Sequence, residues 1–203
     1  MSDHQGKPCS CRACTSCIMV DNLPRQGHTC RHQKTWRVPV FRAVALPPVL
    51  PGRLYLHSMP GRYETWDAFV KAASQHGIST IVCLTPDEEI ARQSPAYAEA
   101  IRRGTLGYAR ACSPLPDYGV PRDWEAYAAF VGRIAGLLRA GETVLVHCGA
   151  GIGRTGTFAI CLLLALGASL LEAREAVRAA GSEPEGEAQK DLTLWCEREF
   201  GVA

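Results

Sequence analysis

Apolar residues along the chain follow two alternating patterns. Continuous apolar runs of strand length occur at residues 79–85 (STIVCLT) and 143–147 (TVLVH), as is typical of strands covered on both faces. Elsewhere apolar residues recur every three or four positions, as they do on one face of a helix. We predict two further strands, over 52–61 and 106–112, and helices over 64–77, 86–104 (one or two helices, broken near Pro95), 121–141 (opening with Pro121), 154–167, 169–181 and 185–200.

Strands that alternate with helices indicate an α/β fold with a central, largely parallel sheet flanked by helices on both faces. In such sheets a ligand binds beyond the carboxyl ends of the strands. A glycine-rich segment directly follows the predicted strand 143–147 and so occupies that place. The longest apolar run, residues 157–171, is shorter than the roughly 20 residues that cross a bilayer, so we expect a buried core helix there and no membrane span.

Composition and charge fit a folded globular protein. The 203 residues are 47% hydrophobic and 21% charged, and the formal net charge is only +2. This balance gives no sign of a broad nucleic-acid-binding face, but it leaves room for a local anion site. The first residues contain no apolar stretch, so we expect no secretory signal peptide, a cytoplasmic location and reduced thiols. The oligomeric state stays open.

The ten cysteines are unevenly distributed, with five of them in the first thirty residues. This distribution predicts a Cys-rich leader over residues 1–36 and one domain over residues 37–203. The leader has residue types that bind zinc, but its cysteine spacing fits no common zinc finger, and so short a segment cannot bury a core of its own. We therefore favour a disordered leader without metal. The alternative metal ligands are Cys9, Cys11, Cys14, Cys17 and Cys30.

The segment VHCGAGIGRTGTF (residues 146–158) places four glycines between a predicted strand and a predicted helix. Backbone N–H groups at a helix N-terminus form an anion site, and glycines let the backbone curl so that these groups converge. Arg154 can hold two phosphate oxygens, and Cys148 lies beneath them, where positive surroundings favour the nucleophilic thiolate. A Walker-type nucleotide loop is excluded, because no lysine occurs between Lys71 and Lys190.

Taken separately, a cysteine after a strand is usually a buried apolar residue, and a glycine cluster is usually a turn. Together, HCGAGIGRTG (residues 147–156) resembles the His-Cys-x5-Arg-Ser/Thr-Gly signature of the cysteine-dependent protein tyrosine phosphatase superfamily at all ten positions. A second segment, PDYGVP (residues 116–121), resembles the mobile acid loop of that family and lies ahead of a helix, as it does there. The resemblance in element order runs from about Leu54 to Phe200.

This resemblance implies a phosphatase with its phosphate-binding loop at a strand-to-helix junction, a phosphocysteine intermediate and no cofactor. Cys148 would be the nucleophile, and Arg154 would bind the phosphate and the transition state. Asp117 would be the general acid and then the general base, although an Asp between Pro and Tyr-Gly also suits a plain turn. The phosphate-binding loop would comprise Gly149, Ala150, Gly151, Ile152, Gly153 and Arg154.

The resemblance also implies supporting roles. Thr155 would help the thiolate to leave, and His147 would support the loop from behind. Gln189 would position the hydrolytic water, or it would be an ordinary solvated residue at a helix start. Cys83 would form a protective disulfide with Cys148, or it would be a buried strand cysteine.

Two departures from the family pattern bear on the substrate. Leu115 stands where tyrosine-specific members have a tryptophan before the acid loop, and their tyrosine-clamping Lys-Asn-Arg-Tyr segment is missing, so we expect a compact dual-specificity-like or bacterial-type member. No basic residue lies among residues 149–153, which argues against a highly charged inositol headgroup. We expect a phosphoprotein substrate carrying phosphotyrosine, with phosphoserine and phosphothreonine left open. The alternatives are a phosphatase of phosphoinositides or other phosphomonoesters, and a non-catalytic phosphate-binding or metal- or redox-sensing module.

Overall fold

A five-stranded sheet lies at the centre of the computed structural model, which describes residues 40–201. The predicted leader and its candidate metal ligands fall outside this range. The strand order is β1-β2-β5-β3-β4. The strands are β1 (Arg42–Val44), β2 (Arg53–His57), β3 (Thr80–Cys83), β4 (Ala109–Cys112) and β5 (Thr143–His147). Only β1 runs antiparallel to its neighbour, so the expected largely parallel sheet is confirmed. The three-residue β1 was not predicted.

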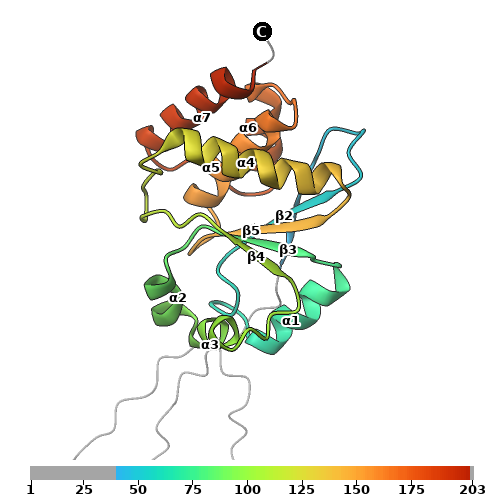
Figure 1. The fold of residues 1–203 in the computed structure, drawn as a ribbon, viewed down its shortest axis with the longest axis vertical. Coiled ribbons are helices and arrows are strands. Elements are labelled where there is room, and N and C mark those ends of the chain that lie inside the picture. Colours follow the sequence, from blue (N-terminus) through green and yellow to red (C-terminus); the bar gives the residue numbers. More distant parts are fainter. Residues whose placement is uncertain (1–39, 202–203) are drawn as a thin grey trace, which may run out of the picture. The chain divides into compact units, whose positions relative to one another are not determined.

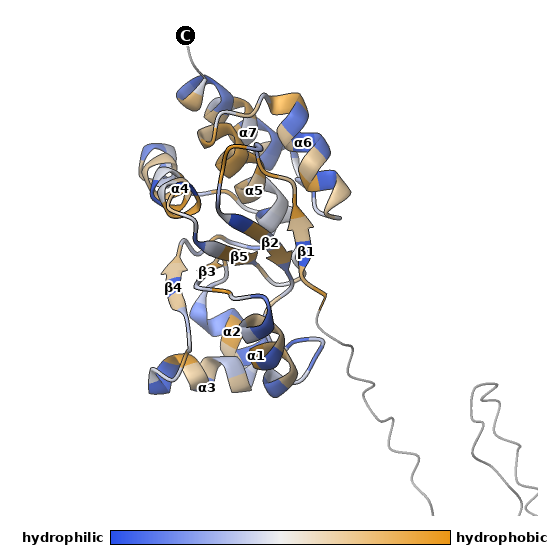
Figure 2. Cartoon of the chain, turned by 90° about the vertical axis from the view of Figure 1, so that its right-hand side faces the viewer, coloured by the Kyte–Doolittle hydropathy of each residue, from blue (hydrophilic) through white to orange (hydrophobic). Residues whose placement is uncertain are grey.

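Helices cover both faces of the sheet, as expected (Figure 1). One layer contains α1 (Trp66–Gln75), α2 (Asp87–Gln93) and α3 (Pro95–Arg103). The other contains α4 (Trp124–Arg139), α5 (Gly153–Ala165), α6 (Leu170–Ala179) and α7 (Glu187–Phe200). Figure 2 shows the hydrophobic strands of the sheet, in orange, between these two layers.

The core explains why the longest apolar run is a helix inside the protein. Every residue of α5 from Gly153 to Leu164 is buried, as are all five residues of β5. The predicted buried core helix is therefore confirmed up to Ala165, whereas the end of the run passes through a turn into α6, where Leu171 is exposed. No helix within residues 40–201 is both long enough and apolar enough to span a bilayer.

Local signals set several helix ends. Pro95 is the first residue of α3, so the predicted break lies where expected and two helices form. The helix predicted to open with Pro121 begins instead at Trp124. Asp123 is its N-cap, and the Asp123 carboxylate accepts a hydrogen bond from the Ala126 N–H at 2.9 Å. This correction leaves Pro121 in the loop that carries Asp117.

The register of the sheet brings the carboxyl ends of three strands together. His147, the last residue of β5, pairs with His57 of β2 on one side and with Cys83 of β3 on the other. The chain then turns from β5 into α5 through residues 148–152. This turn is the place at which a parallel sheet presents its ligand site.

Candidate active site

The loop between β5 and α5 holds the cysteine of the predicted signature. Cys148 follows β5 directly, and its side chain is buried, with 3% of its surface exposed. The backbone N–H of Gly151 donates to the Cys148 Sγ at 3.3 Å. Gly149, Gly151 and Gly153 are buried, whereas Ala150 and Ile152 are exposed at the loop surface. The loop therefore brings one backbone N–H, that of Gly151, against the buried sulfur.

Close packing explains two of the four glycines. Gly151 has a φ of +78°, and a Cβ added there would lie 2.4 Å from the backbone oxygen of His57. A Cβ at Gly156, in the first turn of α5, would lie 2.5 Å from the backbone nitrogen of Glu183. Both contacts are far shorter than a real Cβ makes, so any side chain would push the loop or the helix out of place.

Arg154, in the first turn of α5, is buried with 3% of its surface exposed. The Arg154 Nη1 and Nη2 donate to the two carboxylate oxygens of Glu89 at 2.9 and 3.0 Å. Nη1 also donates to the Leu115 carbonyl oxygen at 3.1 Å, and Nη2 lies 3.0 Å from the Asp117 Oδ1. Burial acts to lower the pKa of Arg154, but the hydrogen bonds to Glu89 and the charge of Cys148 outweigh it, so the pKa is raised.

Asp117 lies on a short turn between β4 and α4. The Gly119 N–H donates to the Pro116 carbonyl oxygen at 2.9 Å and closes this turn. The Asp117 side chain is 69% exposed, yet one of its oxygens reaches Arg154. Leu115, just before this turn, is buried and donates its N–H to the Leu84 carbonyl oxygen at 3.1 Å. The acid loop is thus attached to the core through Leu115.

His147 contacts the backbone of the loop, and its supporting role stays a prediction. The His147 Nδ1 is 3.2 Å from the Cys148 carbonyl oxygen, and Nε2 is 3.2 Å from the Tyr97 hydroxyl. Because a carbonyl oxygen only accepts, Nδ1 is the donor in the first of these contacts. The ring therefore connects the backbone of Cys148 to α3, away from the open side of the loop.

Thr155 and Gln189 are both buried. The Thr155 Oγ1 has no hydrogen-bond partner among residues 40–201, so its role toward the thiolate stays a prediction. Gln189 is completely covered, which rules out the solvated alternative. The Gln189 Oε1 accepts from the Glu185 N–H at 2.9 Å, and Nε2 donates to the Gly119 carbonyl oxygen at 3.4 Å. Gln189 thereby connects the acid loop to the loop before α7.

Cys83 lies at the end of β3, paired in register with His147 and with Cys112 of β4. Its side chain packs in a cluster with Met59, Ile90 and Tyr97, apart from the larger cluster that contains Cys148. The hydrogen bond with Cys112 lowers the pKa of Cys83. Cys83, Cys112 and Cys148 are all free thiols. The disulfide between Cys83 and Cys148 stays a prediction.

Sequence reasoning missed two residues that contact the site. Glu89, in α2, holds Arg154, and Arg42, in β1, donates to the Gly151 carbonyl oxygen. Neither residue belongs to a motif. Within residues 40–201, no group of three or more His, Cys, Asp or Glu side chains is placed to hold a metal ion.

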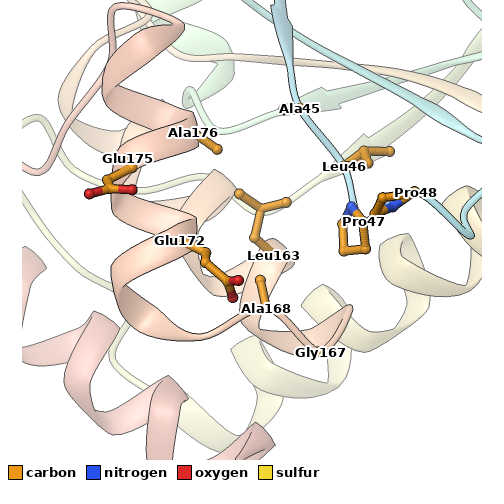
Figure 3. Close-up of a pocket in the computed structure, with 10 residues that line it drawn as sticks. All are labelled: Ala45, Leu46, Pro47, Pro48, Leu163, Gly167, Ala168, Glu172, Glu175 and Ala176. Carbon is orange, nitrogen blue, oxygen red and sulfur yellow. The ribbon is translucent and has the colours of Figure 1, made fainter.

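A groove of about 460 Å³ lies elsewhere on the domain (Figure 3). Its walls come from the segment after β1, which includes Leu46 and Pro47, and from residues of α5 and α6 such as Leu163 and Glu172. Gly167 and Ala168 place the groove at the C-terminal end of α5. Cys148 lies just before the N-terminal end of α5, and a helix of 13 residues is about 20 Å long. This groove is therefore separate from the candidate active site.

Comparisons with known proteins agree with this geometry. A family model described as "PTP-SAK: Swiss Army Knife protein, DSP-PTPase phosphatase domain" matches residues 45–195. The chain is similar to the structure of kinase associated phosphatase (KAP) with its catalytic-site cysteine substituted by serine. The identity is 18% and the TM-score 0.70, over 82% of this chain and 98% of that chain. It is also similar to a mutant form of Tk-PTP, with 27% identity and a TM-score of 0.61 over 79% and 97% of the two chains. A third similar structure is that of PTPMT1 in complex with PI(5)P, with 18% identity and a TM-score of 0.58 over 75% of this chain and 94% of that chain.

Proposed function

The chain belongs to the dual-specificity-type (DSP-PTPase) phosphatases of the cysteine-dependent protein tyrosine phosphatase superfamily, and on this premise we propose that it hydrolyses phosphotyrosine in proteins. One observation carries the proposal. The Cys148 thiol receives the Gly151 N–H at 3.3 Å, directly before the helix whose first turn presents the buried Arg154. A nucleophile beneath an anion-binding loop suits phosphoryl transfer, in which positioning and charge stabilisation supply most of the catalysis.

In the first step, the Cys148 sulfur forms a bond to phosphorus, and the bond from phosphorus to the tyrosyl oxygen breaks. The loop N–H groups and Arg154 hold the three remaining phosphoryl oxygens, whose negative charge must be stabilised in the transition state. The tyrosyl oxygen leaves with the bonding electron pair and takes a proton from Asp117. The ion pair of Asp117 with Arg154 at 3.0 Å supports this role, because it brings the carboxyl group to the edge of the phosphate site.

In the second step, water attacks the phosphocysteine. Asp117, now ionised, accepts a proton from the water, the phosphorus–sulfur bond breaks, and orthophosphate and the Cys148 thiolate are released. We assign Thr155 to the stabilisation of this leaving thiolate and His147 to support of the loop. The hydrogen bond from Gln189 to the acid loop supports a role in placing that loop and the water near it.

The surroundings of the loop favour a substrate with a single phosphate. No basic side chain lies among residues 149–153, and a Cβ added at Gly149 would be 2.7 Å from the Glu89 carboxylate, which therefore sits against the loop. Glu89 is paired with Arg154, and the Arg62 guanidinium would lie 3.1 Å from the same Cβ, so the argument for a single phosphate rests on the uncharged residues 149–153. Tyr118, beside Asp117, is 63% exposed and offers an aromatic surface to a tyrosyl ring.

The experiment measures phosphate release from phosphotyrosine, phosphoserine and phosphothreonine peptides and from phosphoinositide vesicles, under reducing conditions with EDTA. We expect turnover of phosphotyrosine by the native protein, its loss in Cys148→Ser, and its retention in Cys112→Ser, which removes an exposed cysteine outside the loop. Comparable rates on all three peptides would extend the function to dual specificity. Turnover of the vesicles alone, or of nothing, would overturn the proposal.

A further inference from the structure

An arginine from the edge strand β1 contacts the underside of the phosphate-binding loop. The Arg42 side chain is half-buried, and its Nη2 donates to the carbonyl oxygen of Gly151. Its Nη1 donates to the carbonyl oxygen of Gly181, at the end of α6. The neighbouring Ser182 donates its hydroxyl to the same Gly151 oxygen at 2.7 Å. Two donors from distant parts of the chain thus meet on one carbonyl group of the loop.

This carbonyl belongs to the residue whose amide contacts the nucleophile. Gly151 gives its N–H to the Cys148 Sγ at 3.3 Å, while Arg42 and Ser182 use both lone pairs of its oxygen. The φ of +78° at Gly151 is a conformation that the bare chain does not strongly prefer. The Gly151 carbonyl belongs to the planar peptide that joins Gly151 to Ile152, so fixing it anchors the Gly151 Cα and sets the direction of the Ile152 N–H, the next amide of the loop.

Burial lowers the pKa of Arg42, and the charge of Cys148 opposes this lowering. Arg154 is paired with Glu89 and Asp117. No carboxylate within residues 40–201 forms an ion pair with Arg42.

Two histidines complete the charged and titratable surroundings. Burial lowers the pKa of His57 to about 4, so its ring is neutral at the pH of a phosphatase assay. The His147 ring lies between the Cys148 carbonyl and the Tyr97 hydroxyl.

We propose that Arg42 is a positioning residue of the phosphatase site: together with Ser182 it holds the peptide between Gly151 and Ile152, and with it the phosphate-binding loop, in the conformation that encloses the Cys148 sulfur. The inference rests on the proposed function for its effect on turnover. Its effects on the thiol and on anion binding do not depend on the identity of the substrate.

The test compares Arg42→Gln, Arg42→Lys and Ser182→Ala with the native protein. The matched control is Arg53→Gln, which removes an arginine from the adjacent strand β2 that donates to the Thr143 hydroxyl instead of the loop. The first readout is the rate of Cys148 alkylation by iodoacetamide against pH, followed at the Cys148 peptide by mass spectrometry. The second is the affinity for inorganic phosphate, and the third is kcat/KM on a phosphotyrosine peptide.

For Arg42→Gln we expect faster alkylation of Cys148, because the loop that buries its sulfur is no longer held. Phosphate affinity and kcat/KM should each fall by about tenfold or more, since the loop amides lose their direction. Arg42→Lys should restore neither, because a single ammonium cannot span both carbonyl groups. Ser182→Ala should lower kcat/KM several-fold.

Unchanged alkylation and phosphate binding in a folded Arg42→Gln protein would overturn the inference. If that variant fails to fold, a Ser182→Ala protein with native phosphate affinity and native kcat/KM would overturn it instead. Equal losses in the Arg53→Gln control would also overturn it, because they would indicate a general weakening of the sheet. Absence of turnover in the native protein would refute the proposed function while leaving the alkylation and binding readouts valid.

Discussion

Asp117→Asn is expected to bind phosphate more tightly while turning over more slowly. The reason lies in the donors of Arg154. Each Nη group has two N–H bonds, and Glu89 takes one from each. Leu115 takes the second from Nη1, and the Asp117 oxygen lies 3.0 Å from Nη2. A phosphate can therefore use only the Nε N–H and the second Nη2 N–H of Arg154, and Asp117 competes for the second of these.

The magnitude follows from the exposure of the two partners. Arg154 is 3% exposed, but Asp117 is 69% exposed, so solvent screens the ion pair and its loss is worth about 1 kcal/mol at most. Removal of this competing charge should lower the Kd of inorganic phosphate by about fivefold. Loss of the general acid should lower kcat on a phosphotyrosine peptide by about 100-fold to 10,000-fold. The slowing should be smaller for an aryl phosphate whose phenol leaves without protonation.

Calorimetric titration with phosphate and steady-state kinetics measure the two effects on the same preparations. Asp87→Asn is the matched control, because Asp87 is also an exposed aspartate, 75% accessible, paired with an arginine, Arg110, at 2.7 Å. It should leave phosphate affinity and kcat unchanged. A Kd in Asp117→Asn equal to or higher than the native value would refute the competition argument. An unchanged kcat on the peptide would refute the acid assignment.

Three further predictions concern the support of the site. His57→Gln should flatten the pH dependence of the free energy of unfolding. Burial lowers the pKa of His57 from 6.5 to about 4, so the unfolded chain binds the proton more readily, and the native protein loses up to about 3 kcal/mol of stability as the pH falls from 6.5 to 4. Urea unfolding at several pH values measures this loss, with His76→Gln as control. Glu89→Gln should lower the free energy of unfolding by about 2 kcal/mol and the Tm by about 4–8 °C, because the buried Arg154 loses a charged partner. The control Glu88→Gln, at an exposed glutamate, should lower neither. An equal Tm in the two variants would contradict the argument. Gly151→Ala should reduce phosphate release by at least about 100-fold, since the new Cβ would meet the His57 backbone oxygen. In the control Gly167→Ala the φ is +94° but a Cβ would have no atom within 4 Å, so this variant tests backbone strain alone. Equal losses of activity in the two variants would assign the effect to strain.

Local sequence patterns predicted those parts of the fold that depend on local chemistry. The buried run of β5, the glycines after it and Arg154 are adjacent in sequence, so one segment specifies the strand, the turn and the helix start. The same holds for the break at Pro95. The start of α4 was misplaced because two local signals compete there, and the Asp123 cap prevailed over Pro121. The strand β1 is too short, at three residues, to show a period.

Contacts between distant segments could not be predicted in this way. Glu89 reaches Arg154 across 65 positions, and Arg42 reaches Gly151 across 109. A helical glutamate and a strand arginine carry no sign of their partner, because a charged residue on an amphipathic element is usually solvated. Their partners follow only from the strand order β1-β2-β5-β3-β4, which places β2 with β1 beyond it on one side of β5, and β3 with the following helix α2 on the other. The motif therefore identifies the atoms that react, whereas the topology determines which groups hold them. It is these outer groups, more than the signature itself, that we expect to distinguish this phosphatase from others with the same loop.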